Sequence, residues 1–172
     1  RQWEKALRLF DSMQRRGLEA DVVAFNAAIS ACEKGAQWER ALQLLEEMPR
    51  RRVEPDVISF SAAISACEKC EQWEKALQLL DDMRQRGVEP NVVSYSAAIS
   101  ACAKGRQWER ALQLLEEMRH QGVEPNVISY SATISACEKG GQWKTALRLL
   151  YEMEEVGLKP SVISFNAAIS AC

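Results

Sequence analysis

The chain has 172 residues, of which 47% are apolar and 27% charged, and its formal net charge is −2. This composition is typical of a folded protein and excludes a disordered or collagen-like chain, while the slight acidity excludes the overall basic excess of a nonspecific nucleic-acid binder. No stretch reaches the roughly 18 apolar residues of a membrane-spanning helix, and the first residues lack the pattern of a secretion signal, so we expect no membrane insertion.

The sequence repeats itself every 35 residues. All five tryptophans keep this interval, as do five methionines and five of the six cysteines. These positions are Trp3, Trp38, Trp73, Trp108 and Trp143; Met13, Met48, Met83, Met118 and Met153; and Cys32, Cys67, Cys102, Cys137 and Cys172. A period of this length is typical of stacked-repeat proteins, in which each repeat buries its apolar face against its neighbours. Packed helices lie about 8–10 Å apart, beyond disulfide reach, so we expect reduced cysteines and a reducing compartment.

The period divides the chain into one array of repeats. We assign a partial repeat to residues 1–21, full repeats to 22–56, 57–91, 92–126 and 127–161, and a partial repeat to 162–172. Both ends interrupt a repeat, and a solenoid without polar capping helices exposes its core. We therefore expect the chain to be a piece of a longer protein.

The second helix of most repeats is followed by a glycine, which suits the left-handed residue that closes a helix. These glycines are Gly17, Gly87, Gly122 and Gly157. In the repeat 22–56, Pro49 follows Met48 and Arg52 stands where the glycine is expected. Because proline removes a backbone donor and clashes with the preceding turn, we predict a shorter second helix there, followed by a basic turn at residues 50–52.

The repeat 57–91 shows the two predicted helices. From Ser59 to about Lys69, apolar residues recur at three- and four-residue steps, which indicates one buried helical face; they are Phe60, Ala63, Ile64 and Cys67. From about Gln72 to Gln85 the same spacing is kept by Trp73, Ala76, Leu77, Leu80 and Met83. Pro90 prevents this second helix from continuing. The predicted fold class is all-α, a right-handed solenoid of stacked helix-turn-helix repeats.

The side of the first helix opposite the apolar stripe is small and polar. At about 100° per residue, this side holds Ile58, Ser61, Ser65, Glu68 and Lys69. Stacked side by side, such residues would form a groove with one aliphatic, one hydrogen-bonding and one basic residue per repeat. Single-stranded nucleic acid, with its flat bases, polar base edges and one negative charge per nucleotide, suits such a groove.

The cadence V-[VI]-x-[FY]-[NS]…A-L-x-L-L-x-E-M…G-[VL]-x-P-[DNS] resembles the pentatricopeptide repeat over essentially the whole chain. The resemblance implies a one-base-per-repeat code for single-stranded RNA. Its reading residues lie in the first turn of the first helix and at the last position of the repeat. The implied pairs are Asn26 with Asp56, Ser61 with Asn91, Ser96 with Asn126, and Ser131 with Ser161. The family code implies the target 5′-U-A-A-(A)-3′, the last pair departing from the common ones, and Asn166 suggests a further pyrimidine but lacks its partner.

Two further sets of residues follow from the resemblance. Aliphatic residues placed to wedge between bases are Val23, Ile58, Val93, Ile128 and Ile163, for which packing between repeats is the alternative. Lysines placed to meet phosphates are Lys34, Lys69, Lys104 and Lys139. The resemblance also implies a mitochondrial or chloroplast factor in RNA processing, stability or translation.

Enzymatic and metal-binding roles are not expected. Cys67 and Cys70 have the spacing of half a metal site, but no second pair exists and His120 is the only histidine. Adjacent acids such as Glu46 and Glu47 point about 100° apart on a helix, which fits a solvated face. We expect no cofactor, no metal and no small-molecule substrate.

The competing hypothesis is a protein-binding scaffold. Tetratricopeptide repeats share the two-helix plan, but their period is about 34 residues and their cadence differs. A pentatricopeptide chain serving as a structural subunit of a large organellar complex, with protein partners, remains the alternative to RNA binding. A designed array is disfavoured because a designer removes free thiols and keeps the stop glycine, so recent duplication better explains the similarity of the repeats.

Overall fold

The computed structural model describes residues 2–172, and this part of the chain holds ten α-helices and no strand. The chain divides into two compact units, Arg1–Pro90 and Asn91–Cys172. The first contains α1 (Gln2–Arg15), α2 (Val22–Lys34), α3 (Trp38–Arg50), α4 (Val57–Lys69) and α5 (Trp73–Gln85). The second contains α6 (Val92–Lys104), α7 (Trp108–His120), α8 (Val127–Lys139), α9 (Trp143–Glu155) and α10 (Val162–Ala171).

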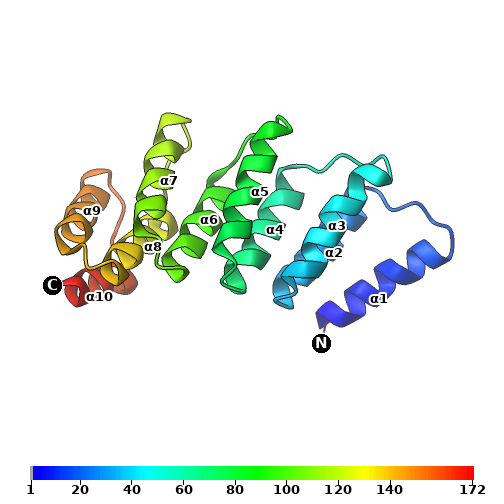
Figure 1. The fold of residues 1–172 in the computed structure, drawn as a ribbon, viewed down its shortest axis with the longest axis horizontal. Helices are drawn as coiled ribbons and strands as arrows, with labels where there is room; N and C mark the ends of the chain where they lie inside the picture. The colour runs from blue at the N-terminus through cyan, green and yellow to red at the C-terminus, as the bar shows by residue number, and fades with distance from the viewer. Residues whose placement is uncertain (1) are drawn as a thin grey trace. The chain divides into compact units, whose positions relative to one another are not determined.

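Within each unit, two-helix repeats stack through their first helices, and the order of the helices can be followed in Figure 1. In the first unit α2 packs against α4, and α3 contacts both of them. In the second unit α6 packs against α8 and α8 against α10, while α7 and α9 each contact two successive first helices. The predicted all-α solenoid of stacked helix-turn-helix repeats is confirmed.

Burial differs between the two helices of a repeat because their numbers of neighbours differ. A first helix such as α4 is apolar or small on several sides, and it buries Phe60, Ala63, Ile64 and Cys67 as predicted. A second helix keeps a charged outer face and one buried stripe. In α5 this stripe includes Leu79, while Leu77 is only half-buried. The sequence pattern favoured Leu77, but the buried stripe of α5 includes Leu79 instead.

The first helices begin two residues earlier than the apolar pattern predicts, because a side chain caps each of them. The residue before α4 is Asp56, whose carboxylate accepts hydrogen bonds from the backbone N–H groups of Ile58 and Ser59. Asn91, Asn126 and Ser161 cap α6, α8 and α10 in the same position. Capping satisfies backbone donors that have no partner inside the helix.

Tyrosine replaces phenylalanine in α6 and α8 of the second unit, and each hydroxyl finds partners. The Tyr95 hydroxyl donates to Glu117 over 3.3 Å. Arg119 of α7 donates to the Tyr130 hydroxyl of α8 over 2.6 Å and forms an ion pair with Glu152 of α9. Three successive helices are thereby joined by polar contacts at the edge of their apolar core.

The prediction of a shorter second helix in the repeat 22–56 is wrong. Helix α3 has 13 residues, as many as α5, and it includes Pro49. Pro49 lies one residue before the end of the helix, so its missing donor removes a single hydrogen bond of the last turn. The closing turn survives, since the Val53 N–H donates to the Met48 carbonyl over 2.9 Å, as Val88 does to Met83 over 3.0 Å.

Arg52 takes the left-handed conformation that glycine takes in the other repeats. Its φ is 61°, compared with 72° for Gly87. A left-handed residue with a side chain costs about 1–2 kcal/mol, whereas glycine adopts this conformation freely.

We therefore expect Arg52→Gly to raise the free energy of unfolding by about 1 kcal/mol, measured by urea denaturation. Arg51→Gly is the matched control, because the φ of Arg51 is −94° and its side chain forms an ion pair with Glu47. Arg51→Gly should give no gain. Equal stabilisation by both substitutions would contradict a conformational origin.

Candidate nucleic-acid interface

The second residue of every first helix is an exposed aliphatic side chain. Val23, Ile58, Val93, Ile128 and Ile163 have exposed fractions between 52% and 68%. Packing between repeats, which is the alternative role for them, therefore covers at most about half of each side chain. Exposed aliphatic groups that recur at one position of each repeat are available to contact a flat apolar ligand.

Reading residues assigned to one pair come into contact across successive first helices. The Asn26 amide donates to both oxygens of the Asp56 carboxylate, over 3.0 and 3.2 Å. The Ser96 hydroxyl donates to the Asn126 side chain over 3.4 Å, and the hydroxyls of Ser131 and Ser161 lie 3.3 Å apart. Of the remaining reading residues, Ser61 lies in the first compact unit, Asn91 starts the second, and Asn166 is exposed on α10.

The reading serines are more buried than their position on an open arc predicted. Ser61, Ser96 and Ser131 have exposed fractions of 6%, 5% and 8%, while Asn26 is half-buried. A serine side chain is short, so the neighbouring residues of its own helix and its capping partners cover it. The Ser131 hydroxyl, for example, donates to the Val127 carbonyl over 2.6 Å. The three serine side chains therefore lie deeper below the surface than the side chain of Asn26.

Asp56 is held in its charged form. Burial raises the pKa of Asp56, but hydrogen bonds from the Ser59 N–H, the Asn26 amide, the Ser59 hydroxyl and the Ile58 N–H outweigh it and hold the pKa below its ordinary value. The carboxylate thus presents a fixed negative charge beside the Asn26 amide.

All four predicted phosphate-binding lysines are exposed at the ends of first helices. Two of them reach back to the preceding repeat. Lys69 forms an ion pair with Glu33 over 2.8 Å, and Lys139 donates to the Ala103 carbonyl over 3.1 Å. Ala103 stands where the other repeats have Glu33, Glu68 and Glu138. Lys139 therefore has no glutamate at this position and donates to the backbone carbonyl instead.

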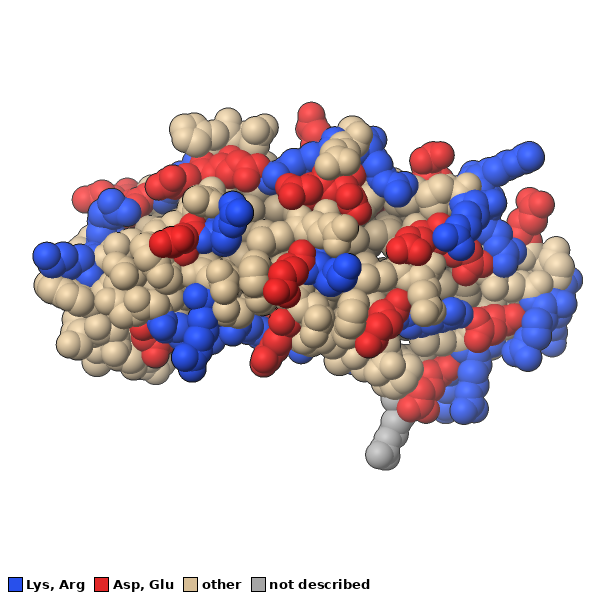
Figure 2. Space-filling view, in the orientation of Figure 1, with Lys and Arg blue, Asp and Glu red and all other residues tan. Residues whose placement is uncertain are grey.

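Acidic and basic side chains are interspersed over the face shown in Figure 2, with no large area of one sign in that view. Among the residues described, no helix is both long and apolar enough to cross a bilayer. The same residues include no group of three or more potential metal ligands among His, Cys, Asp and Glu. Because acidic and basic side chains alternate over that face, a charged ligand would meet the side chains of individual repeats, and the small net charge of the chain says little about its binding.

The repeated cysteines of the complete repeats are buried fillers of the first helices, as predicted. Burial raises the pKa of Cys32 to about 11, and burial with the neighbouring Cys70 raises that of Cys67 to about 12. These thiols are protonated and unreactive at neutral pH. Cys70 is half-buried, and its thiol donates to the Ala36 carbonyl over 3.2 Å.

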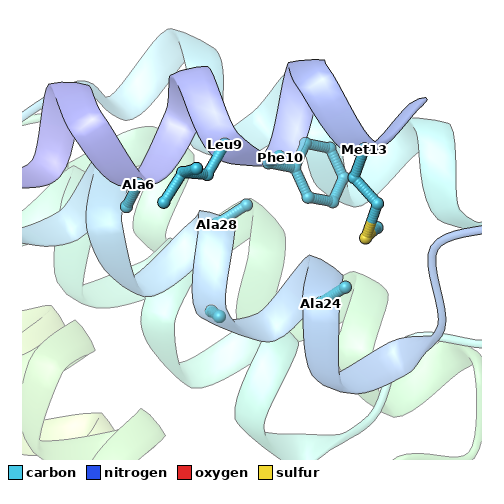
Figure 3. Close-up of a pocket in the computed structure, with 7 residues that line it drawn as sticks. Ala6, Leu9, Phe10, Met13, Ala24 and Ala28 are labelled. Atoms are coloured by element: carbon cyan, nitrogen blue, oxygen red, sulfur yellow. The ribbon is translucent and has the colours of Figure 1, made fainter. Parts of the chain in front are cut away.

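A pocket of about 300 Å³ lies between α1 and α2 and is lined by apolar side chains, including Leu9, Phe10 and Met13 (Figure 3). Leu9 is 72% exposed, whereas the equivalent Leu44 is fully buried. Helix α1 packs against α2, and polar side chains also join it to α3, since Arg40 forms an ion pair with Asp11 and Gln14 donates to Glu47. The pocket offers no polar side chain to orient a ligand, so we do not assign it a binding function.

One set of serines at the starts of the first helices was not predicted from the sequence. The third residue of α4, α6, α8 and α10 is a fully buried serine that hydrogen-bonds its helix-capping residue. These serines are Ser59, Ser94, Ser129 and Ser164. The signal was present as an Asp, Asn or Ser followed three residues later by Ser, a variant of the capping box.

Asp56 gives the first unit a pH-dependent stability. Its pKa is lowered on folding, so its contribution to stability is fully present above the unfolded pKa of about 3.9 and is lost as the pH falls through the lower folded value. We expect the wild type to lose more stability than Asp56→Asn on acidification from about pH 7 to about pH 3, measured by urea denaturation. Asparagine keeps the cap, as Asn91 and Asn126 show. Equal losses would contradict the charge effect.

Comparisons with known proteins agree with this architecture. The family described as "Pentatricopeptide repeat domain" matches residues 78–140 and 134–172. The "PPR repeat family" matches residues 20–69, and "PPR repeat" matches residues 1–18 and 58–88. No curated protein matches the chain at a significant level.

Solved structures are similar over nearly the whole chain. The crystal structure of the pentatricopeptide repeat protein PPR10 from maize matches with 30% identity and a TM-score of 0.79, covering 98% of this chain and 24% of that one. PPR10 in complex with an 18-nt psaJ RNA element matches with 28% identity and a TM-score of 0.79, covering 94% of this chain and 24% of that one.

The PPR domain of Arabidopsis thaliana protein-only RNase P 1, solved in complex with tRNA, matches with a TM-score of 0.83 over 99% of this chain and 90% of that one. Its identity is 17%, so this similarity concerns the fold alone. The present chain spans 24% of the length of PPR10. Because one family description alone covers residues 78–172, more than half of the sequence, the chain belongs to the pentatricopeptide repeat family.

Proposed function

We propose that the chain binds single-stranded RNA along the starts of its first helices, with one base read by each repeat. The observation that carries the proposal is the exposed aliphatic residue at the start of each first helix, next to a position that reads the base. Apolar contact between a base and such a side chain is similar for all four bases, because every base has a flat apolar face. The neighbouring polar groups discriminate between the bases by their edges. The similar protein PPR10 has been solved with an 18-nt RNA element.

The base preferences follow the family code residue by residue. Asn26 with Asp56 selects uracil, and Ser61 with Asn91 and Ser96 with Asn126 select adenine. Ser131 with Ser161 favours adenine as well. The recessed serines leave room for a purine, and the longer Asn26 side chain reaches the smaller pyrimidine. The proposed target is 5′-U-A-A-(A)-3′, bound by residues 22–161 acting as one array.

Val23, Ile58, Val93, Ile128 and Ile163 are the proposed wedges between bases, and Lys34, Lys69, Lys104 and Lys139 the proposed phosphate contacts. We assign the chain a binding role without catalysis, in organellar RNA processing, stability or translation. Contacts to only four bases, less the cost of ordering the RNA, imply weak binding by the 172 residues alone.

Fluorescence anisotropy with RNA carrying UAAA or GCCC, at low and physiological salt, tests the proposal. We expect tighter binding of UAAA. The double substitution Ser61→Asn with Asn91→Asp should move the preference at the second base from adenine to uracil, because it recreates the pair of the preceding repeat. Absence of binding to both RNAs at low salt would overturn RNA binding by this chain and favour the protein scaffold.

The ion pair between Lys69 and Glu33 predicts an effect on affinity. Glu33→Gln should strengthen RNA binding about two- to threefold and steepen its salt dependence, since one more phosphate contact by a single strand changes the slope of log K against log salt by about −0.7. Glu46→Gln is the matched control, because it removes the same charge from the exposed side of α3. If both substitutions change the slope equally, Lys69 makes no specific phosphate contact.

A further inference from the structure

A buried serine connects the two reading residues of a pair. Ser59, the third residue of α4, is fully buried, and its hydroxyl accepts a hydrogen bond from the Asp56 N–H over 3.2 Å. The same hydroxyl donates to the Asn26 side-chain oxygen over 2.5 Å and lies 3.0 Å from the Asp56 carboxylate. Ser164 repeats this arrangement, 2.8 Å from the Ser131 hydroxyl and 3.0 Å from that of Ser161.

The contacts of Asn26 assign the orientation of its amide. A carboxylate only accepts hydrogen bonds, so the amide nitrogen must face Asp56, as the two contacts of 3.0 and 3.2 Å require. The Ser59 hydroxyl has one proton, which it shares between the amide oxygen over 2.5 Å and the Asp56 carboxylate over 3.0 Å. An amide held at both ends cannot rotate by half a turn without losing both contacts, since its donor and acceptor would exchange places.

A fixed amide distinguishes the two pyrimidines. The two oxygens of one carboxylate lie close together, so a single N–H of Asn26 is shared between them. The amide then retains its other N–H and one oxygen lone pair for a ligand. Uracil and cytosine present opposite hydrogen-bonding groups at the positions where they differ, and a freely rotating amide could satisfy either. An amide in one orientation satisfies only one of the two patterns.

We propose that the Ser59 hydroxyl fixes the orientation of the Asn26 amide and thereby sets the preference of this repeat for uracil over cytosine. Ser59 is a positioning residue, because it is buried and acts through Asn26 and Asp56. The proposal rests on the RNA-binding function proposed above. It assigns part of the base preference to a residue outside the reading pair.

The chain itself shows that the serine is dispensable for the helix. Ala24 takes the place of Ser59 at the start of α2. Helix α2 still begins at Val22, capped by a hydrogen bond of 2.9 Å from the Ala24 N–H to Asp21. Ser59→Ala should therefore leave α4 folded.

The test compares wild type, Ser59→Ala and Ser129→Ala for binding to UAAA and CAAA by anisotropy at low salt. We expect the ratio of the two affinities to fall about three- to tenfold in Ser59→Ala, the factor carried by the net contribution of one hydrogen bond. Ser129→Ala is the matched control. It removes an equally buried hydroxyl. The residue that corresponds to Asn26 in the repeat before Ser129 is Ser96, which has no amide to orient. Its ratio should remain that of the wild type.

A second readout needs no RNA. In Ser59→Ala the pKa of Asp56, followed by carboxyl NMR, should rise towards its ordinary value, because the serine hydroxyl and the ordered Asn26 amide both lower it. Ser59→Thr, which keeps the hydroxyl, should restore both the pKa and the base preference.

The outcomes separate the two proposals. A wild type without preference for UAAA over CAAA overturns the proposed code. A wild type that prefers UAAA, with the same ratio in Ser59→Ala, overturns the positioning role alone. An equal loss of affinity for both RNAs in Ser59→Ala overturns it as well, because a merely structural serine would weaken both.

Discussion

The close packing of successive first helices is the contact on which the rest of the structure depends. Small side chains such as Ala63, Ala66 and Ala98 are fully buried and permit this approach. As a result, the capping residue of one helix lies beside the first turn of the preceding helix. Asn26 and Asp56, 30 residues apart in sequence, are brought within hydrogen-bonding distance. Bulky residues at the alanine positions would separate the helices and, with them, Asn26 from Asp56.

Much of this architecture follows from the sequence because each repeat poses the same packing problem. The period, the two helices and the buried positions such as Phe60 and Met83 depend on local spacing, which is visible in the sequence. The effect of Pro49 was wrongly predicted because its cost depends on its distance from the helix end, which the closing turn determines. The burial of Leu79 in place of Leu77 was also not predicted, because both leucines fit the three- and four-residue spacing of a buried stripe.

The candidate site was predictable in part. The exposed aliphatic residues and lysines lie at the helix ends where the pattern placed them. The burial of Ser61 and Ser96 was not predicted. Helical periodicity describes the faces of a single helix, so it does not include the other side chains that cover short residues. Ser59 was overlooked for the same reason, since its contacts cross from one repeat to another.

The capping geometry has a consequence for how such arrays diversify. Asp56 closes one repeat in sequence but starts the next helix in space, and Ser59 belongs to that next helix. The segment that folds and the group of residues proposed to recognise a base are therefore offset from one another. Recombination at a boundary between two repeats within a unit would keep the helix and its cap together, yet it would combine proposed reading residues of different origin. New specificities would then arise at the joins between duplicated segments before any residue is substituted.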